Sequence, residues 1–255
     1  MFLLYVTSAL MFLIGGFGIF GNLNLMWATY RTLPANKKAS CGHLIGTLAF
    51  CDLICIVFEW QNALRLLIGV ENHRRSCFWA ISPYLFAINF QASLILVIAL
   101  DRVYAMFFPM KYRKIQFWTY IAVSMTPGFI FASIIFGMAV AQLDDELIEA
   151  CNPPLGYPPL VSMIWNRWIL GVDSATIVLY VQALMVLYVK KRQMTKSNAE
   201  YSFLTQQQKI MKTLSVVVVA FACSWFSCHC SVLFATMIGL NDTAVHIIQT
   251  VAAVK

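Results

Sequence analysis

Long apolar segments separated by short polar ones dominate the pattern along this chain of 255 residues. The apolar segments are continuous rather than alternating, which is typical of membrane-spanning helices and not of the strands of a membrane β-barrel. A helix also satisfies its backbone N–H and C=O groups within one segment, as a bilayer requires. We therefore predict seven helices, at residues Leu3–Tyr30, Cys41–Ile68, Cys77–Phe107, Phe117–Ala141, Trp165–Val189, Lys209–Ile238 and Ala244–Lys255.

The lengths of these segments define the predicted fold class. Six of them can cross a hydrocarbon core of about 30 Å at about 1.5 Å per residue. The last has twelve residues and would reach only about 18 Å. We expect an all-α membrane protein, a seven-transmembrane helix bundle with an apparently truncated seventh helix, forming a single domain over residues 1–255. Before the fifth segment, Pro153, Pro154, Pro158 and Pro159 predict an extended, turning lid.

Composition strengthens the membrane interpretation. The chain is 60% hydrophobic and only 11% charged, whereas a soluble domain is nearer half apolar and a quarter charged. Its net charge of +7 would suit a nucleic-acid partner, but the positions of the basic residues indicate otherwise. Twelve lie in or beside the connections after the first, third and fifth segments, against four near the others: Arg65, Arg74, Arg75 and Arg167. By the positive-inside rule, we expect a multi-pass plasma-membrane protein with its N-terminus outside and no nucleic-acid partner.

An acidic and a basic residue end the third segment, at Asp101 and Arg102. Ionisable residues in a spanning helix are costly, and they usually face the interior of the bundle. Because adjacent residues on a helix do not face one another well, we expect a local charge contact rather than a formal ion pair. A buried cation that exchanges its partners would give a two-state switch.

Further motifs accompany Asp101 and Arg102 along the chain. The third segment ends in Asp101-Arg102-Val103-Tyr104-Ala105, followed by Pro109 and Tyr112, and Cys77 precedes Arg102 by 25 residues. Gly21-Asn22 and Leu48-Ala49-Phe50-Cys51-Asp52 stand in the first two segments. Together these motifs resemble those of rhodopsin-like (class A) G-protein-coupled receptors. Within that family, Tyr30-Arg31-Thr32 with Ser40-Cys41-Gly42-His43 is similar to nematode serpentine chemoreceptors of the Srsx-like group.

This resemblance implies roles for particular residues. Asp101, Arg102, Tyr188 and Trp225 would form the switch that couples to the G protein. Cys77 and Cys151 would form a disulfide that joins an outer loop to the third helix. Closing that loop would contribute about 4 kcal/mol in the chain-entropy model. Asn22 and Asp52 would form a polar core between the first two helices, or simply a hydrogen-bonded packing pair.

The ligand pocket that the resemblance implies lies between the outer halves of the helices. Glu59, Tyr84, Asn89, Asp173 and His229 fall at that depth, although each could equally be a structural residue. An amine receptor would carry an aspartate at position 84, so the tyrosine there argues against a monoamine ligand.

The implied function is that of a receptor with a chemosensory role. An extracellular small molecule or short peptide, of unknown identity, would shift the helix bundle and activate a cytoplasmic heterotrimeric G protein. A membrane transporter and a non-signalling receptor remnant are the alternatives. We expect no enzymatic activity and no cofactor, because the nearest metal-like run, Cys228-His229-Cys230, places alternate residues on different faces of a helix.

Overall fold

The computed structural model describes residues 2–32, 41–112, 114–148 and 150–193, with the isolated positions 205, 208, 230, 231 and 234. The predicted helices Lys209–Ile238 and Ala244–Lys255 lie outside the described residues, apart from positions 230, 231 and 234 of the first. Trp225 and His229 also lie outside.

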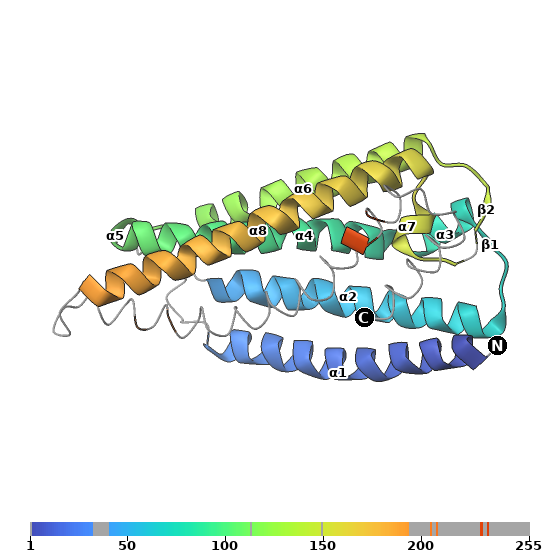
Figure 1. Cartoon of the computed structure of the whole chain (residues 1–255), viewed down its shortest axis with the longest axis horizontal. Coiled ribbons are helices and arrows are strands. Elements are labelled where there is room, and N and C mark those ends of the chain that lie inside the picture. The colour runs from blue at the N-terminus through green and yellow to red at the C-terminus, as the bar shows by residue number, and fades with distance from the viewer. Residues whose placement is uncertain are drawn as a thin grey trace.

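The described residues form five long helices, which run lengthwise beside one another (Figure 1). Each is long and apolar enough to cross a membrane, so an all-helical membrane protein is confirmed over the described residues. Helix α4 is central, because it packs against α2, α6 and α8, whereas α1 packs against α2. The five helices are α1 (Phe2–Thr32), α2 (Cys41–Ile68), α4 (Ser82–Phe107), α6 (Phe117–Ala141) and α8 (Pro159–Gln193).

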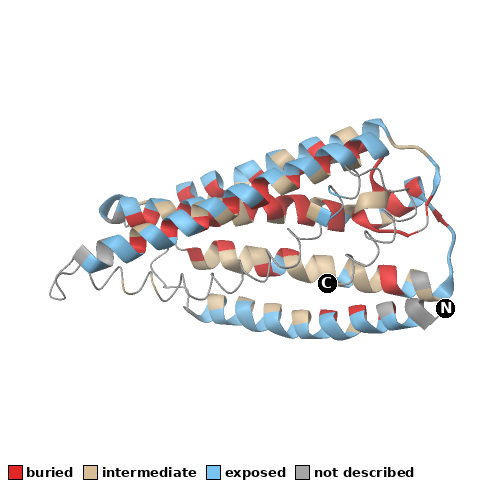
Figure 2. Ribbon diagram, in the orientation of Figure 1, coloured by how far each residue is buried: buried red, intermediate tan, exposed pale blue. Residues whose placement is uncertain are grey.

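Burial follows this arrangement. Buried residues line α4 and the faces turned toward it, while the outward faces of α1, α6 and α8 are exposed (Figure 2). Those exposed faces carry large apolar side chains, among them Phe17 and Phe20 at 71% exposure and Trp118 at 67%. A water-soluble protein rarely exposes such continuous apolar surface. These faces therefore suit contact with lipid.

Short elements gather at one end of the bundle, which we call the disulfide end. Strand β1 (Asn72–His73) pairs antiparallel with β2 (Leu147–Ile148), with Asn72 opposite Ile148. Helices α3 (Arg74–Ala80) and α7 (Pro153–Gly156) lie beside this pair. At the other end, which we call the Arg102 end, α4 is followed by the short helix α5 (Pro109–Tyr112).

The third predicted helix is interrupted, which its continuous apolar pattern does not indicate. Ile81 separates α3 from α4, and the cause is Pro83 in the first turn of α4. A proline has no amide hydrogen, so it cannot donate to the carbonyl four residues earlier, which belongs to Trp79. The hydroxyl of Ser82 donates to that carbonyl instead, at 3.0 Å.

The prediction of an extended proline-rich lid is wrong. Asn152 caps α7 by accepting a hydrogen bond from the amide of Leu155 at 3.1 Å, and Pro153 stands in the first turn. Pro159 begins α8, six residues before the predicted start at Trp165. Proline suits the first turn of a helix because its fixed φ is helical and its missing N–H has no partner there anyway. These prolines therefore start helices in this segment.

Candidate functional site

A disulfide between Cys77 and Cys151 anchors the disulfide end, in agreement with the prediction from the sequence. It joins α3 to the segment that precedes α7, with 5.5 Å between the two Cα atoms, a usual separation for this bond. Both cysteines are buried, and they pack among Phe78, Tyr157 and Trp165. The bond therefore holds the loop between α6 and α8 against α3, which precedes α4.

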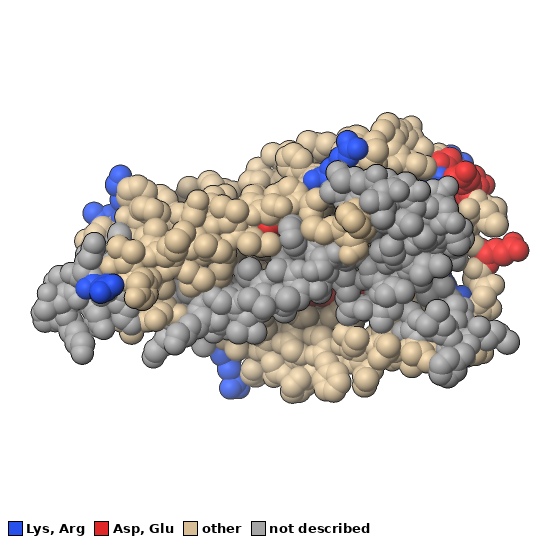
Figure 3. All heavy atoms as spheres, viewed as in Figure 1, with Lys and Arg blue, Asp and Glu red and all other residues tan. Residues whose placement is uncertain are grey.

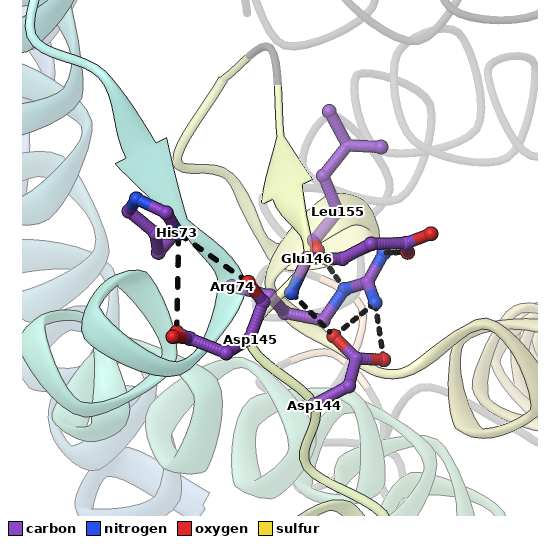
Figure 4. Close-up of polar contacts among 6 residues, drawn as sticks. All are labelled: His73, Arg74, Asp144, Asp145, Glu146 and Leu155. Carbon is purple, nitrogen blue, oxygen red and sulfur yellow. Dashed lines mark hydrogen bonds and ion pairs between the residues drawn. The ribbon is translucent and has the colours of Figure 1, made fainter.

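Arg74 makes a second fastening beside the disulfide, which we call the Arg74 clasp (Figure 4). Its guanidinium, which is buried, forms ion pairs with Asp144 and, at 2.9 Å, with Glu146. Its Nε donates to the carbonyl of Leu155 at 3.2 Å. Nearby, Nδ1 of His73 lies 3.3 Å from the carbonyl oxygen of Asp145. The clasp thus ties the loop to α3 at several points.

The clasp changes the acidity of Asp144. Partial burial acts to raise its pKa, but hydrogen bonds from Arg74 and from the amide of Glu146, together with the charge of Arg74, outweigh this effect. The pKa of Asp144 therefore lies below its ordinary value of 3.8. The charge pattern predicted no partner for Arg74. Its position in one loop, with Asp144 and Glu146 in the next loop on the same side of the predicted bundle, was the signal that could have identified this pairing.

Replacing Arg74 by glutamine should destabilise the folded protein. Breaking a fully buried pair costs about 3–5 kcal/mol, but both carboxylates here are partly exposed and screened. We therefore expect a loss of about 2 kcal/mol, measured as a lower thermal unfolding temperature in detergent. Because the pKa of Asp144 is depressed, its contribution is present above 3.8 and is lost as the pH falls through its lower folded-state value. The difference from wild type should therefore shrink only in that acidic range.

Arg75, which is exposed, provides the matched control. Arg75→Gln removes the same charge from the next residue without touching Asp144 or Glu146, so its unfolding temperature should stay close to wild type. Equal losses in the two variants would show that general charge, not the clasp, accounts for the effect.

Three of the predicted ligand-binding residues lie in two hydrogen-bonded pairs. The hydroxyl of Tyr84, on α4, donates to the carboxylate of Glu59, on α2, and the ring of Phe58 stacks against Tyr84 with 6.3 Å between centroids. Further along α4, Nδ2 of Asn89 donates to the hydroxyl of Tyr157 at 2.8 Å. These contacts link residues 25 and 68 positions apart, so no local sequence pattern could predict them.

Tyr157 is a residue that reasoning from the sequence missed. It follows α7 and inserts its ring against Trp165, with 5.6 Å between centroids. Burial raises the pKa of Tyr157, although the hydrogen bond from Asn89 lowers it in part, so its hydroxyl keeps its proton. Asp173, the fourth predicted ligand-binding residue, is also buried, on α8 at 1% exposure.

The structure gives Asp52 a hydrogen-bond partner on α4. Nε2 of Gln91, on α4, donates to the carboxylate of Asp52 at 2.6 Å. The other side of the same amide is 3.6 Å from Sγ of Cys55. The long glutamine side chain reaches across from the central helix, and among the described residues Asn22 gives Asp52 no hydrogen bond. Gln91 therefore links α4 to α2 at Asp52, and a polar core that includes Asn22 stays a prediction.

At the Arg102 end, a buried polar cluster forms around Arg102, which is 1% exposed. Its Nε donates to Asp101 at 3.0 Å and its Nη2 to the hydroxyl of Tyr112 at 3.0 Å. Asp101 and Arg102 form an ion pair, so the expectation of a looser contact was wrong. The long arginine side chain folds back onto its neighbour, and Tyr112 of α5 encloses both. We call these three residues the Arg102 cluster.

Tyr112 joins this cluster as a neutral group. Burial raises its pKa, and the negative charge of Asp101 raises it further. Its hydroxyl therefore stays protonated, accepting from Arg102 while lying 3.4 Å from the carboxylate of Asp101. Tyr188, by contrast, is 68% exposed on α8, whereas Tyr180 is buried in the same apolar core as Tyr112. Participation of Tyr188 in a switch stays a prediction.

A family model describing the serpentine type 7TM GPCR chemoreceptor Srsx matches residues 16–254. The match spans nearly the whole chain, including most or all of each described long helix and the region beyond them. It confirms the resemblance drawn from the motifs in the sequence.

Proposed function

The chain belongs to the Srsx family of serpentine seven-transmembrane chemoreceptors, and from this premise we propose that a ligand bound at the disulfide end activates a G protein at the Arg102 end. Receptors of this family are multi-pass membrane proteins without enzymatic activity. We further propose that residues 1–255 form a single bundle, with the disulfide end outside the cell and the Arg102 end in the cytoplasm.

The distribution of charge supports this orientation. Acidic side chains gather at the disulfide end, where basic ones also lie, whereas the charged side chains visible at the Arg102 end are basic (Figure 3). Arg31 closes α1, Lys111 lies in α5, and Arg192 lies in the last turn of α8. Basic residues at one end are typical of the cytoplasmic side, and a disulfide persists on the side that faces the oxidising exterior.

One observation carries the proposed mechanism: the two polar sites lie at opposite ends of the same central helix. Helix α4 carries Tyr84 and Asn89 toward one end and Asp101 and Arg102 at the other. A ligand that favours one position of α4 would therefore bias the surroundings of Arg102. Such a change requires the ligand to bind the two states with different affinities.

Substitution of Arg102 tests the proposal. We expect Arg102→Gln to reach the cell surface and to lose G-protein activation by roughly tenfold or more, equivalent to about 1.4 kcal/mol of coupling free energy or more. Activation is measured as nucleotide exchange on the G protein, normalised to surface receptor. The control is Arg31→Gln, an exposed cation at the same end, which should signal normally.

Two outcomes would contradict the proposal. Undiminished exchange in Arg102→Gln would remove the residue from coupling. Labelling of the segment between residues 190 and 212 from outside intact cells would invert the orientation.

A further inference from the structure

An apolar groove lies between α6 and α8, on the side of the bundle that faces lipid. It encloses about 650 Å³ and is lined along α6 from Ala122 to Ile134, with Trp168 of α8 opposite. The rings of Phe131 and Trp168 stack with 5.2 Å between their centroids. Thr126 contributes a hydroxyl, but this group already donates to the carbonyl of Ala122 at 2.7 Å. The groove therefore presents almost entirely apolar walls, and we call it the α6–α8 groove.

The length of the α6–α8 groove matches one leaflet of a bilayer. Ile134 follows Ala122 by twelve residues, which is about 18 Å of helix, and half of the hydrocarbon core is about 15 Å. Helix α6 runs from the Arg102 end toward the disulfide end (Figure 1), so Ile134 marks the end of the groove nearer the disulfide end. An acyl chain that enters the membrane from that side would therefore lie along the groove.

A cation stands beside this end of the groove. Arg167 precedes Trp168 on α8 and is exposed, and among the described residues it has no hydrogen bond or ion pair. Helix α6 carries no charged residue, and Asp144 and Glu146, in the loop at this end, are held by Arg74. The guanidinium of Arg167 is therefore available to an anion from outside the protein.

Arg167 lies at a depth from which its side chain can reach the lipid headgroups. The span that contains it, Pro159–Val189, has 31 residues, or about 46 Å of helix against about 30 Å of hydrocarbon. With the span centred, hydrocarbon begins about 8 Å after Pro159, and Arg167 stands about 12 Å after it. Its Cα–Cβ bond tilts toward the N-terminus of α8, which is at the disulfide end. The long side chain therefore extends toward the headgroups at that side.

We infer that the α6–α8 groove and Arg167 together bind a phospholipid of the leaflet at the disulfide end. One acyl chain fills the groove, and the guanidinium binds the phosphate, whose oxygens it matches in a planar, two-point geometry. The phosphate also offsets the cost of an unpaired charge in a spanning helix. Soluble phosphate would satisfy the cation but not the apolar walls beside it, so the two features together select a lipid.

Trp168 reports on occupancy of the groove, because bromine atoms on an acyl chain quench tryptophan fluorescence only at close contact. The probes are phosphatidylglycerol with dibrominated acyl chains and the diacylglycerol with the same chains, which lacks the phosphate. Each is titrated into the purified receptor in detergent, and the signal of Trp168 is the difference between the parent chain and Trp168→Phe. We expect phosphatidylglycerol to reach half-maximal quenching at a roughly tenfold lower mole fraction, which is the effect of about one charge-assisted hydrogen bond.

Substitutions assign the two parts of the site. Arg167→Gln should remove the difference between the two lipids, whereas Arg167→Lys, which keeps the charge, should retain part of it. Arg75→Gln removes an exposed charge at the same end and should leave the difference within about twofold, because solvent screens that charge. Ile130→Phe fills the groove and should weaken quenching by both lipids. Val140→Phe adds the same ring at an exposed position of α6 outside the groove and should not.

Several results would overturn the inference. Absence of Trp168 quenching by either lipid would show that no lipid occupies the groove. Equal quenching by the two lipids, or a preference that survives Arg167→Gln, would show that Arg167 does not bind the phosphate. Release of the quenching by glycerol 3-phosphate at matched concentration would make the ligand a free phosphate. None of these measurements involves an agonist or a G protein, so this inference and the proposed signalling mechanism fail independently of one another.

Discussion

Replacing Cys77 or Cys151 by serine will lower the unfolding temperature of the detergent-solubilised protein by roughly 10 °C. The disulfide closes a loop with a sequence separation of 74, and the chain-entropy model assigns about 4 kcal/mol to a loop of that size. Without the bond, the Arg74 clasp and the short β1–β2 pair still hold the loop beside α3, but the segment before α7 is no longer tied to α3 covalently. Thermal unfolding followed by a thiol-independent dye measures the change.

The double variant distinguishes a lost bond from two unrelated lesions. Cys77→Ser/Cys151→Ser should be no less stable than either single variant, because one bond is lost in all three. Cys230→Ser, at a partly exposed free cysteine, should change the unfolding temperature little. Additive losses in the double variant would indicate that each cysteine contributes by packing alone.

The sequence predicted the long helices well because lipid imposes a simple requirement on them. The bounds of α2 and α6 agree with the prediction, since polar residues flank both helices in the sequence. The break at Ile81 was missed because Pro83 stands within an apolar run whose pattern alone looks continuous. The start of α8 was missed because Pro159 was assigned to the extended, turning lid, whereas it begins the helix.

The sites were less predictable, because they depend on how helices face one another. Sequence depth correctly placed Glu59 and Tyr84 at one level, but their hydrogen bond needed the rotation of α2 against α4. Asp52 was assigned to Asn22 on the adjacent helix, whereas a longer side chain on the central helix reaches it first. The ion pair between Asp101 and Arg102 was not predicted, because adjacent residues on a helix do not face one another. The long, flexible side chain of Arg102 bends back and forms the pair all the same.

Asp101→Asn will raise ligand-independent signalling by roughly tenfold. The ion pair with Asp101 and the hydrogen bond to Tyr112 hold Arg102 inside the protein at 1% exposure. If Arg102 must leave these partners to engage a G protein, weakening them stabilises the active state relative to the inactive one. A shift of about 1.4 kcal/mol in that balance changes the active population tenfold while it remains small. The measurement is basal nucleotide exchange on the G protein, normalised to surface receptor.

Tyr112→Phe tests the same cluster without removing a charge. It deletes the hydroxyl that binds Arg102 and keeps the ring, whose centroid lies 5.8 Å from the guanidinium carbon. Because this removes one hydrogen bond from a neutral hydroxyl, worth about 1 kcal/mol net, basal signalling should rise severalfold but less than in Asp101→Asn. Tyr104→Phe, which alters an exposed tyrosine on α4, should leave it unchanged. Basal nucleotide exchange that falls in both cluster variants, at equal surface expression, would mean that the Arg102 cluster belongs to the active state and does not restrain it.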